Sequence, residues 1–181
     1  MNPPQSLLVA TRNQGKLAEL RQLLADLPLV LLGLDAFPAI ETIAETGSTF
    51  IENASLKACG YAAQAKLLTL ADDSGLEVDA LAGAPGVRSA RYAGEAASDV
   101  AHIEKLLAEL SNTETLEPKA RFVSAIAIAG SDGSILNVSE GTCEGHIDLA
   151  PRGHNGFGYD PIFVPQGFVS TFAELETEVK N

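Results

Sequence analysis

Basic residues are scarce in this chain, which has 12 Lys and Arg against 24 Asp and Glu and a formal net charge of -12. Nucleic-acid polymers are bound through clustered cations, so this balance argues against a DNA or RNA partner. A small anion stays open as a ligand, because a few placed cations and a divalent metal can reverse the local charge. Half of the basic residues lie in or beside the segments discussed below: Arg12, Lys16, Lys57, Arg88, Arg91 and Arg152.

Cysteine and long apolar runs are also nearly absent. The two cysteines, Cys59 and Cys143, belong to no Cys-x-x-Cys pair, which favours reduced thiols over a disulfide framework. Residues 1–6 lack the basic and apolar segments of a signal peptide, and no apolar run approaches the roughly 20 residues that a membrane helix needs. We therefore expect a cytoplasmic protein with no membrane partner.

The chain does contain enough apolar residues, 46% of 181, to form a sizeable core in a single domain. Hydrophobic periodicity predicts an amphipathic helix over residues 17–27 between strands at 7–10 and 29–32. A further short apolar run predicts a buried strand that ends at Ala71.

The rest of the chain alternates helices with a hairpin. Thr49 and Glu52 form a capping-box pattern at the start of a predicted helix over 50–66, and a second helix is expected over 98–110. Residues 120–144 have the pattern of a long antiparallel hairpin. The predicted fold class is α/β, with a two-lobed mixed sheet and flanking helices around a central cleft, all within one domain of residues 1–181.

The first group with chemical potential is Thr11-x-Asn13-x-x-Lys16, between a strand and a helix. A helix N-terminus offers unpaired N–H groups and partial positive charge to a phosphate, and Lys16 adds a point charge. The motif lacks the glycines of a Walker A loop. The alternative interpretation is an ordinary turn with Thr11 or Asn13 as the helix cap.

A second group, Asp72-Asp73-Ser74-Gly75, follows the third predicted strand. Successive strand residues point to opposite sides, so one carboxylate can serve a ligand while the other anchors the loop. Such a carboxylate could bind Mg²⁺ or accept a proton from an attacking water, and Ser74 could donate to a phosphate. A turn stabilised by Asp side chains is the structural alternative.

Lys57 follows Asn53 by four residues, so both side chains project from one face of the predicted helix. The small apolar residues around Lys57 make it a candidate for the same site, where Glu45, or with less support Glu41, would add a second carboxylate. The alternative for each is a solvated side chain.

Residues 153–161 combine glycines with aromatic rings and one acid. Glycine lets the backbone approach a ligand closely, Phe157 could stack on a base, and N–H groups near Tyr159 and Asp160 could read its edge. A glycine-rich turn with Phe157 and Tyr159 in the core is equally open. The three histidines show no metal-ligand spacing, and His102 is expected on a helix surface.

These segments, in this order, resemble the inosine/xanthosine triphosphate pyrophosphatase family, which removes non-standard purine nucleotides from the precursor pool. The resemblance runs from about Leu7 to the end, and the combination of motifs is highly specific although no single motif is. The matching motifs are Thr11-x-Asn13-x-x-Lys16, residues 45–58 (Glu-Thr-Gly-x-Thr-Phe-x-Glu-Asn-Ala-x-x-Lys-Ala), 71–76 (Ala-Asp-Asp-Ser-Gly-Leu), 83–94 (Gly-Ala-Pro-Gly-Val-x-Ser-Ala-Arg-Tyr-Ala-Gly) and 156–161 (Gly-Phe-Gly-Tyr-Asp-Pro).

The resemblance implies a hydrolase of nucleotide metabolism: Mg²⁺-dependent hydrolysis of ITP, dITP or XTP to the monophosphate and pyrophosphate, in a two-lobed homodimer. It makes Asp73 the proton acceptor and a metal ligand, beside which Glu45 is the second candidate ligand. The implied triphosphate-binding residues are Thr11, Arg12, Asn13, Gln14, Gly15, Lys16, Lys57 and Ser74, and the implied base-binding residues are Phe157, Gly158, Tyr159 and Asp160. Lys180 matches a family lysine that contacts the nucleotide.

Two departures from the family accompany this resemblance. Family members continue past residues 178–181 into a Ser-His-Arg segment, which helps to read the base, and a final helix. Arg12 stands where the family usually has a small or uncharged residue. Two alternatives follow: a nucleotide-binding protein with impaired turnover because of the missing tail, and a house-cleaning pyrophosphatase for modified pyrimidines or other nucleotides.

Overall fold

The computed structural model describes residues 5–180. Within that range, no helix is both long enough and apolar enough to cross a membrane. The strands are β1 (Gln5–Val9), β2 (Leu29–Gly33), β3 (Leu68–Val78), β4 (Lys119–Ala129), β5 (Ile135–Ile147) and β6 (Phe163–Pro165). The α-helices are α1 (Gln14–Leu23), α2 (Phe50–Ala65), α3 (Asp99–Leu110) and α4 (Thr177–Lys180), and short 3-10 helices span Leu34–Ala36, Asp79–Leu81, Gly86–Arg91, Asp160–Ile162 and Phe172–Glu174.

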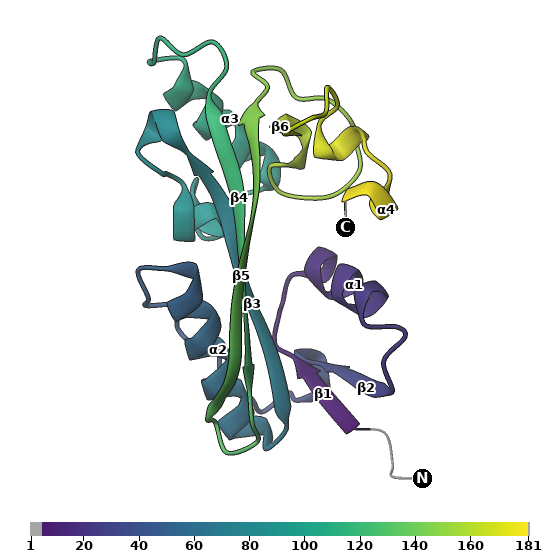
Figure 1. Ribbon diagram of the computed structural model, residues 1–181. Coiled ribbons are helices and arrows are strands. Elements are labelled where there is room, and N and C mark those ends of the chain that lie inside the picture. Colours follow the sequence, from purple (N-terminus) through teal and green to yellow (C-terminus); the bar gives the residue numbers. More distant parts are fainter. Residues whose placement is uncertain (1–4, 181) are drawn as a thin grey trace. The chain divides into compact units, whose positions relative to one another are not determined.

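The strands form one mixed sheet in the order β2-β1-β3-β4-β5-β6 (Figure 1). β1 is parallel to β2 and β3, whereas β5 and β6 are antiparallel. This confirms the predicted α/β class with a mixed sheet and flanking helices. The described chain divides into two compact units, the first made of residues 5–73 and 124–140 and the second of 74–123 and 141–180.

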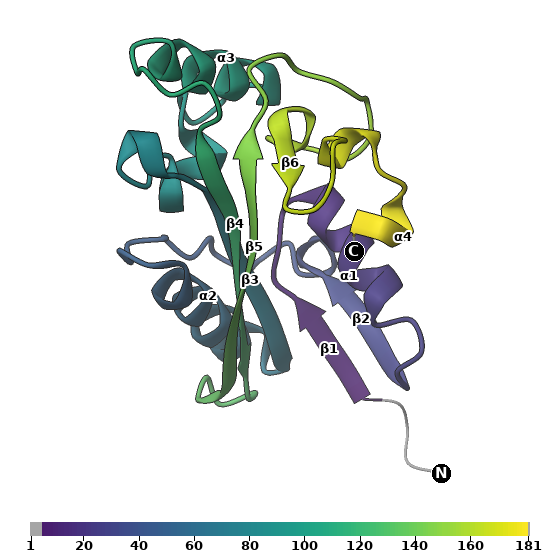
Figure 2. The same ribbon diagram turned by 45° about the horizontal axis from the view of Figure 1, so that its top comes forward.

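In the first unit, β1 is the central strand of a parallel group, with Val9 paired in register to Gly33 of β2 and to Leu70 of β3. The chain leaves β1 toward β2 on one side and reaches β3 on the other, so right-handed crossovers place α1 and α2 on opposite faces of these strands. Figures 1 and 2 show this arrangement. Thr49 caps α2 in the predicted capping box with Glu52.

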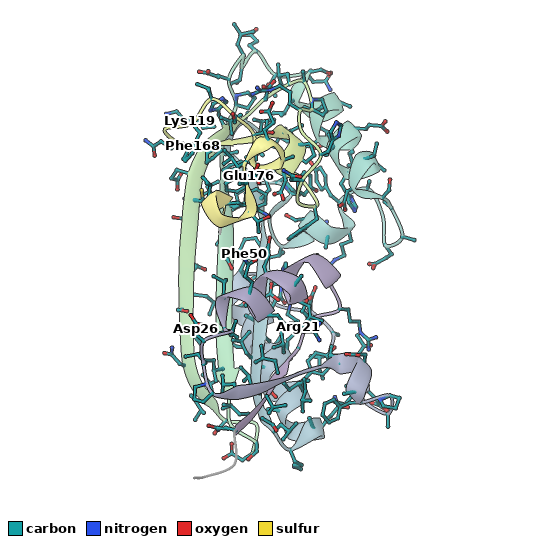
Figure 3. The ribbon with its side chains drawn as sticks, turned by 90° about the vertical axis from the view of Figure 1, so that its right-hand side faces the viewer. Arg21, Asp26, Phe50, Lys119, Phe168 and Glu176 are labelled. Carbon is teal, nitrogen blue, oxygen red and sulfur yellow. The ribbon has the colours of Figure 1, made fainter. Side chains whose placement is uncertain are left out.

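The buried face of α2 is small. Ala54, Ala58 and Ala62 have no exposed surface, and Phe50 at the start of the helix is also buried. Phe50 is labelled in Figure 3. Small side chains let a helix backbone pack close to its neighbours.

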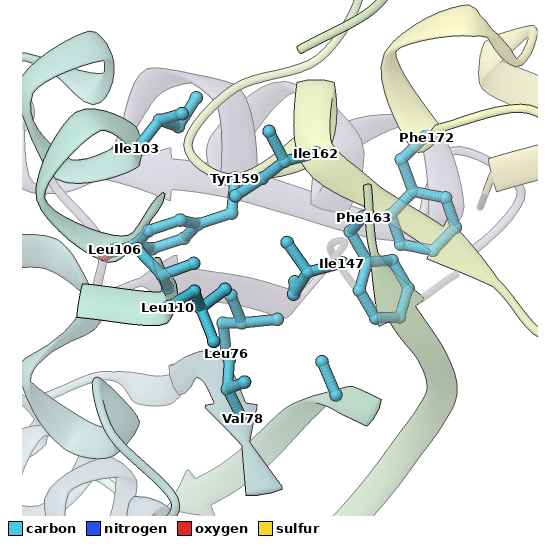
Figure 4. Packing of buried hydrophobic residues seen from close by; sticks show 11 residues of the cluster. Leu76, Val78, Ile103, Leu106, Leu110, Ile147, Tyr159, Ile162, Phe163 and Phe172 are labelled. Carbon is cyan, nitrogen blue, oxygen red and sulfur yellow. The ribbon is translucent and has the colours of Figure 1, made fainter. Parts of the chain in front are cut away.

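The second unit has its own hydrophobic core, shown in Figure 4. Leucines of α3 pack against the distal half of β3, and aromatic rings close the other side, with Phe122 and Phe163 edge to face at 4.8 Å between centroids. Burial of such a cluster supplies the main driving force for this unit. The buried members are Leu76, Val78, Ile103, Leu106, Leu110, Ala120, Ile147, Tyr159, Ile162, Phe163 and Phe172.

The structure corrects three sequence predictions. The third strand does not end at Ala71 but continues to Val78, so Asp72 and Asp73 lie inside β3. The first helix ends at Leu23, not at Leu27. The leucine spacing predicted too long a helix, because Leu23 and Leu27 are exposed and do not belong to a buried helix face. His102 is buried, not on the surface, because its Nδ1 accepts a hydrogen bond from the Ala93 N–H at 2.9 Å.

Candidate active site

Two lysines contact carboxylates on or beside β3 within the first unit. Lys57 of α2 places its Nζ 2.7 Å from Oδ1 of Asp73 and 2.9 Å from Oε1 of Glu45. The side chains of Lys57 and Asp73 are only 12% and 11% exposed, so the lysine is not the solvated residue of the alternative interpretation. A buried ion pair stabilises the fold only when its geometry and hydrogen bonds outweigh the free energy of removing both charges from water.

The second lysine, Lys16 of α1, contacts Asp72, with Nζ 2.5 Å from Oδ2. Asp72 and Asp73 are neighbours in a strand and point to opposite faces, and the lysines that they contact come from the helices on those two faces. Asp72 therefore joins the candidate site through a partner, Lys16, that the sequence did not identify. The signal was available in the Lys16 spacing and in the parallel pairing of two strands that both end in polar residues.

Parallel pairing explains why these motifs meet. The N–H of Ala10, just after β1, donates to the carbonyl of Leu70 in β3 at 2.8 Å. The loop with Thr11 and Asn13 thus begins beside Asp72, since the carboxyl ends of parallel strands share one edge.

The loop itself is also a well-formed helix cap. Oδ1 of Asn13 accepts from the N–H of Lys16, and Oγ1 of Thr11 accepts from the N–H of Asn13. Arg12 is exposed and donates to Oγ1 of Thr42 at 3.2 Å. Gly15 is partly buried in the first turn of α1, whereas the side chain of Gln14 lies outside the described set.

The electrostatics of Asp73 and Lys57 are coupled. Burial raises the pKa of Asp73; Lys57 opposes this and Glu45 adds to it, and the pKa stays above its ordinary value. Burial by itself lowers the pKa of Lys57, but the two carboxylates outweigh burial and raise it. A carboxylate whose pKa is shifted upward is a better proton acceptor than an ordinary aspartate.

The carboxylate pair sets what metal this unit can hold. Among the described residues there is no group of three or more His, Cys, Asp or Glu side chains that could form a metal cage. Mg²⁺ does not need such a cage, because it is usually bound by one or two carboxylates, substrate phosphates and water. Asp73 and Glu45 share one lysine and fit that pattern, whereas Glu41 is exposed.

A separate group forms in the second unit around Asp160, which is 2% exposed. Its Oδ2 lies 2.8 Å from Nζ of Lys180 and accepts the N–H of Phe157 at 2.9 Å. Lys180 also lies 4.7 Å from the centre of the Phe157 ring, a distance typical of a cation–π contact. The structure thus brings Lys180, a predicted nucleotide contact, together with two of the predicted base-binding residues.

The two remaining base-binding candidates are engaged by their own unit. The N–H of Gly158 donates to Oδ2 of Asp99 at 2.7 Å. Tyr159 is buried in the core, and its hydroxyl donates to the carbonyl of Ser89 at 3.0 Å. Only the backbone of Tyr159 is left for a ligand, and Asp99 is a contact that the sequence analysis did not foresee.

Ser74 lies in β3 directly after Asp73 and is partly buried. The next residue, Gly75, packs closely against Ser89: a Cβ at Gly75 would lie 2.3 Å from Oγ of Ser89. The same Oγ accepts a hydrogen bond from the N–H of Leu76. Glycine is therefore required there by close packing of the 86–91 segment.

Comparisons with known proteins all point to one family. The family model of the Ham1 family matches residues 7–181. The chain is 47% identical to a dITP/XTP pyrophosphatase of Bacillus cereus, over 100% of this chain and 89% of the relative. It is 49% identical to a dITP/XTP pyrophosphatase of Halalkalibacterium halodurans, over 96% of this chain and 89% of the relative.

Solved structures agree with these sequences. A HAM1 protein from Coxiella burnetii superposes with a TM-score of 0.88 at 43% identity, covering 98% of this chain and 90% of that one. A nucleoside-triphosphatase, dITP/XTP pyrophosphatase from Mycobacterium abscessus superposes with a TM-score of 0.80 at 45% identity, covering 96% of this chain and 91% of that one.

Proposed function

The chain belongs to the Ham1 family, and from this membership and the lysine–carboxylate contacts on β3 we propose that it hydrolyses dITP, ITP and XTP to the monophosphate and pyrophosphate. The observation that carries the proposal is the buried Lys57, held between Asp73 and Glu45. The names of the relatives, dITP/XTP pyrophosphatase, support the same substrates. We further propose that it works in the cytoplasm as a homodimer.

In this reaction the oxygen of a water forms a bond to the α-phosphorus, the bond from that phosphorus to the bridging oxygen breaks, and pyrophosphate leaves. Asp73 takes the proton of the attacking water. Lys57 and Lys16 bind phosphate oxygens and stabilise the charge that develops on them. Backbone N–H groups at the start of α1, with Thr11, Asn13 and Ser74, hold the rest of the triphosphate.

The charge balance supports a metal requirement. Around β3 the described contacts join Lys16 and Lys57 to Asp72, Asp73 and Glu45, one more carboxylate than ammonium group. That set does not by itself attract a polyanion. Asp73 and Glu45 would hold Mg²⁺, which when bound would offset phosphate charge.

Base selection falls to the group in the second unit. Phe157 would stack on the purine, and Lys180, Asp160 and the backbone of residues 157–160 would contact its polar edge. Hypoxanthine and xanthine carry a 6-oxo group where adenine carries an amino group. A donor aimed at that oxygen is left unpaired by adenine, and buried polar mismatches give large selectivity.

The direct test is pyrophosphate release from dITP, ITP, XTP, GTP, ATP and a modified pyrimidine triphosphate, with Mg²⁺ and with EDTA. We expect turnover of the first three, lost in EDTA and in the Asp73→Asn variant prepared in parallel. Binding of dITP by calorimetry without pyrophosphate release would instead support a nucleotide-binding protein. Preference for the modified pyrimidine would support the other house-cleaning activity.

A further inference from the structure

Asn53, in α2, is completely buried, yet its Nδ2 has no hydrogen-bond partner within residues 5–180. Its Oδ1 accepts the N–H of Gly47 at 2.8 Å. The amide cannot be turned around, because its NH₂ group would then face the Gly47 donor. The unpaired atom is therefore a donor, and a buried donor without a partner is rare in proteins and calls for a physical reason.

The bond between Asn53 and Gly47 fixes the segment that leads to Glu45. Gly47 lies flat against the helix start: a Cβ there would be 2.6 Å from Cβ of Glu52 and 2.8 Å from Oδ1 of Asn53. Glu45 precedes Gly47 by two residues, and its carboxylate reaches Nζ of Lys57. Asn53 and Lys57 are one turn apart on α2, so one helix face holds both the backbone of this segment and the carboxylate at its end.

We propose that Asn53 is a positioning residue for Glu45, and through Glu45 for the binding of Mg²⁺; this rests on the proposed function. Oδ1 sets the position of Gly47 and with it the direction from which Glu45 approaches the metal. Nδ2 gains an oxygen acceptor when the metal and triphosphate bind and residues 45–49 adjust to them. Groups that orient a metal ligand in this way affect metal affinity strongly even though they do not touch the metal.

The test is a cycle of Asn53→Ala, Glu45→Gln and the double variant. Mg²⁺ is titrated by calorimetry into each protein with α,β-methylene-dITP, an analogue in which the bond to be cleaved cannot be hydrolysed. We expect Asn53→Ala to weaken Mg²⁺ binding about 10-fold. In the Glu45→Gln background the same change should matter less than about 2-fold, because coupled residues are not additive.

A matched control is Ala62→Gly, which removes a buried methyl group from the last turn of the same helix. It should lower Tm, as Asn53→Ala does, while Mg²⁺ affinity stays at the wild-type value. A loss of Mg²⁺ affinity in this control, equal to that of Asn53→Ala, would show that any weakening of α2 suffices and would overturn the proposal.

Two NMR observations follow the hydrogen bonds themselves. The Gly47 amide should be protected from exchange in the wild type and should lose protection in Asn53→Ala. The side-chain amide resonances of Asn53 should move when Mg²⁺ and the analogue are added together, as Nδ2 gains its acceptor. Unchanged side-chain resonances would overturn the role of Nδ2.

The remaining outcomes separate the proposals. If Glu45→Gln weakens Mg²⁺ binding and Asn53→Ala does not, or if Asn53→Ala has the same effect in both backgrounds, the positioning role is wrong. If Glu45→Gln has no effect, both the metal role of Glu45 and the role of Asn53 are wrong. Release of pyrophosphate from dITP by the wild type would even then leave the proposed hydrolysis standing.

Discussion

Asp72 and Asp73 are consecutive in β3, but their carboxylates contact lysines of different helices: Asp72 lies 2.5 Å from Nζ of Lys16, and Asp73 lies 2.7 Å from Nζ of Lys57. The alternation of side chains along a strand produces this division. One pair of residues thus ties α1 and α2 to the same point of β3.

Replacing Asp73 with asparagine should change the pH dependence of stability. The pKa of Asp73 is raised by folding, so the native state binds its proton more tightly than the unfolded state, and wild-type stability should rise as pH falls through that pKa. The amide introduced by Asp73→Asn cannot titrate, hence the variant should lose this rise and should equal or exceed the wild-type Tm at neutral pH. Thermal unfolding of both proteins between pH 4 and 8 measures the pH dependence of Tm. A variant that is less stable at neutral pH and shows the wild-type slope would contradict the raised pKa.

The acidic limb of kcat/KM should report the same group in the free enzyme. Glu45 raises the pKa of Asp73, so Glu45→Gln should move this limb to lower pH. Lys57 lowers that pKa, so Lys57→Met should move the limb to higher pH. The profiles are measured well below saturation with Mg²⁺ and with residual activity normalised, because bound Mg²⁺ would itself lower the pKa values of its carboxylate ligands. Shifts of the same sign in the two variants would exclude Asp73 as the titrating group.

Removing Lys16 should separate stability from activity. Lys16→Met leaves the buried Asp72 carboxylate without its partner, and we expect a loss of about 3 kcal/mol in unfolding free energy, at the low end for a broken buried pair. Adding Asp72→Leu should restore most of this, because an apolar pair can replace a buried ion pair. Pyrophosphate release should stay down about 10²-fold in kcat in both variants. Denaturant titration and steady-state kinetics give the two readouts, and recovery of activity in the double variant would refute phosphate binding by Lys16.

Two glycines of the 156–160 segment form a matched pair. A Cβ at Gly156 would lie 1.9 Å from Oδ2 of Asp160, whereas a Cβ at Gly158 would meet nothing within 4 Å, and both residues have positive φ. Gly158→Ala should cost only the backbone penalty, about 1–2 kcal/mol. Gly156→Ala should cost more and should raise KM for XTP, because Asp160 must leave its contacts with Lys180 and Phe157. Equal Tm and KM values for the two variants would argue against a role of Asp160 in nucleotide binding.

The order of elements was largely predictable from the sequence because their patterns are local. The capping box of Thr49 and Glu52, the N-cap at Ser98 and the alternation of the hairpin act within a few residues. The end of β3 was not predictable in this way. Two aspartates look like the polar end of a strand, but each is neutralised by a lysine distant in sequence, so the strand continues to Val78. His102 was misplaced for the same reason, since its partner is a backbone N–H outside its helix.

By itself, the sequence determined the family, the α/β class and the residue types that can handle a metal-bound triphosphate, because motif spacing and hydrophobic period are properties of the chain. Only the tertiary structure decided the pairing of Lys16 with Asp72, the sharing of Lys57 by Asp73 and Glu45, and the isolation of the Asn53 donor. Each of these depends on which side chains meet after burial has removed water, and a linear sequence does not contain those distances.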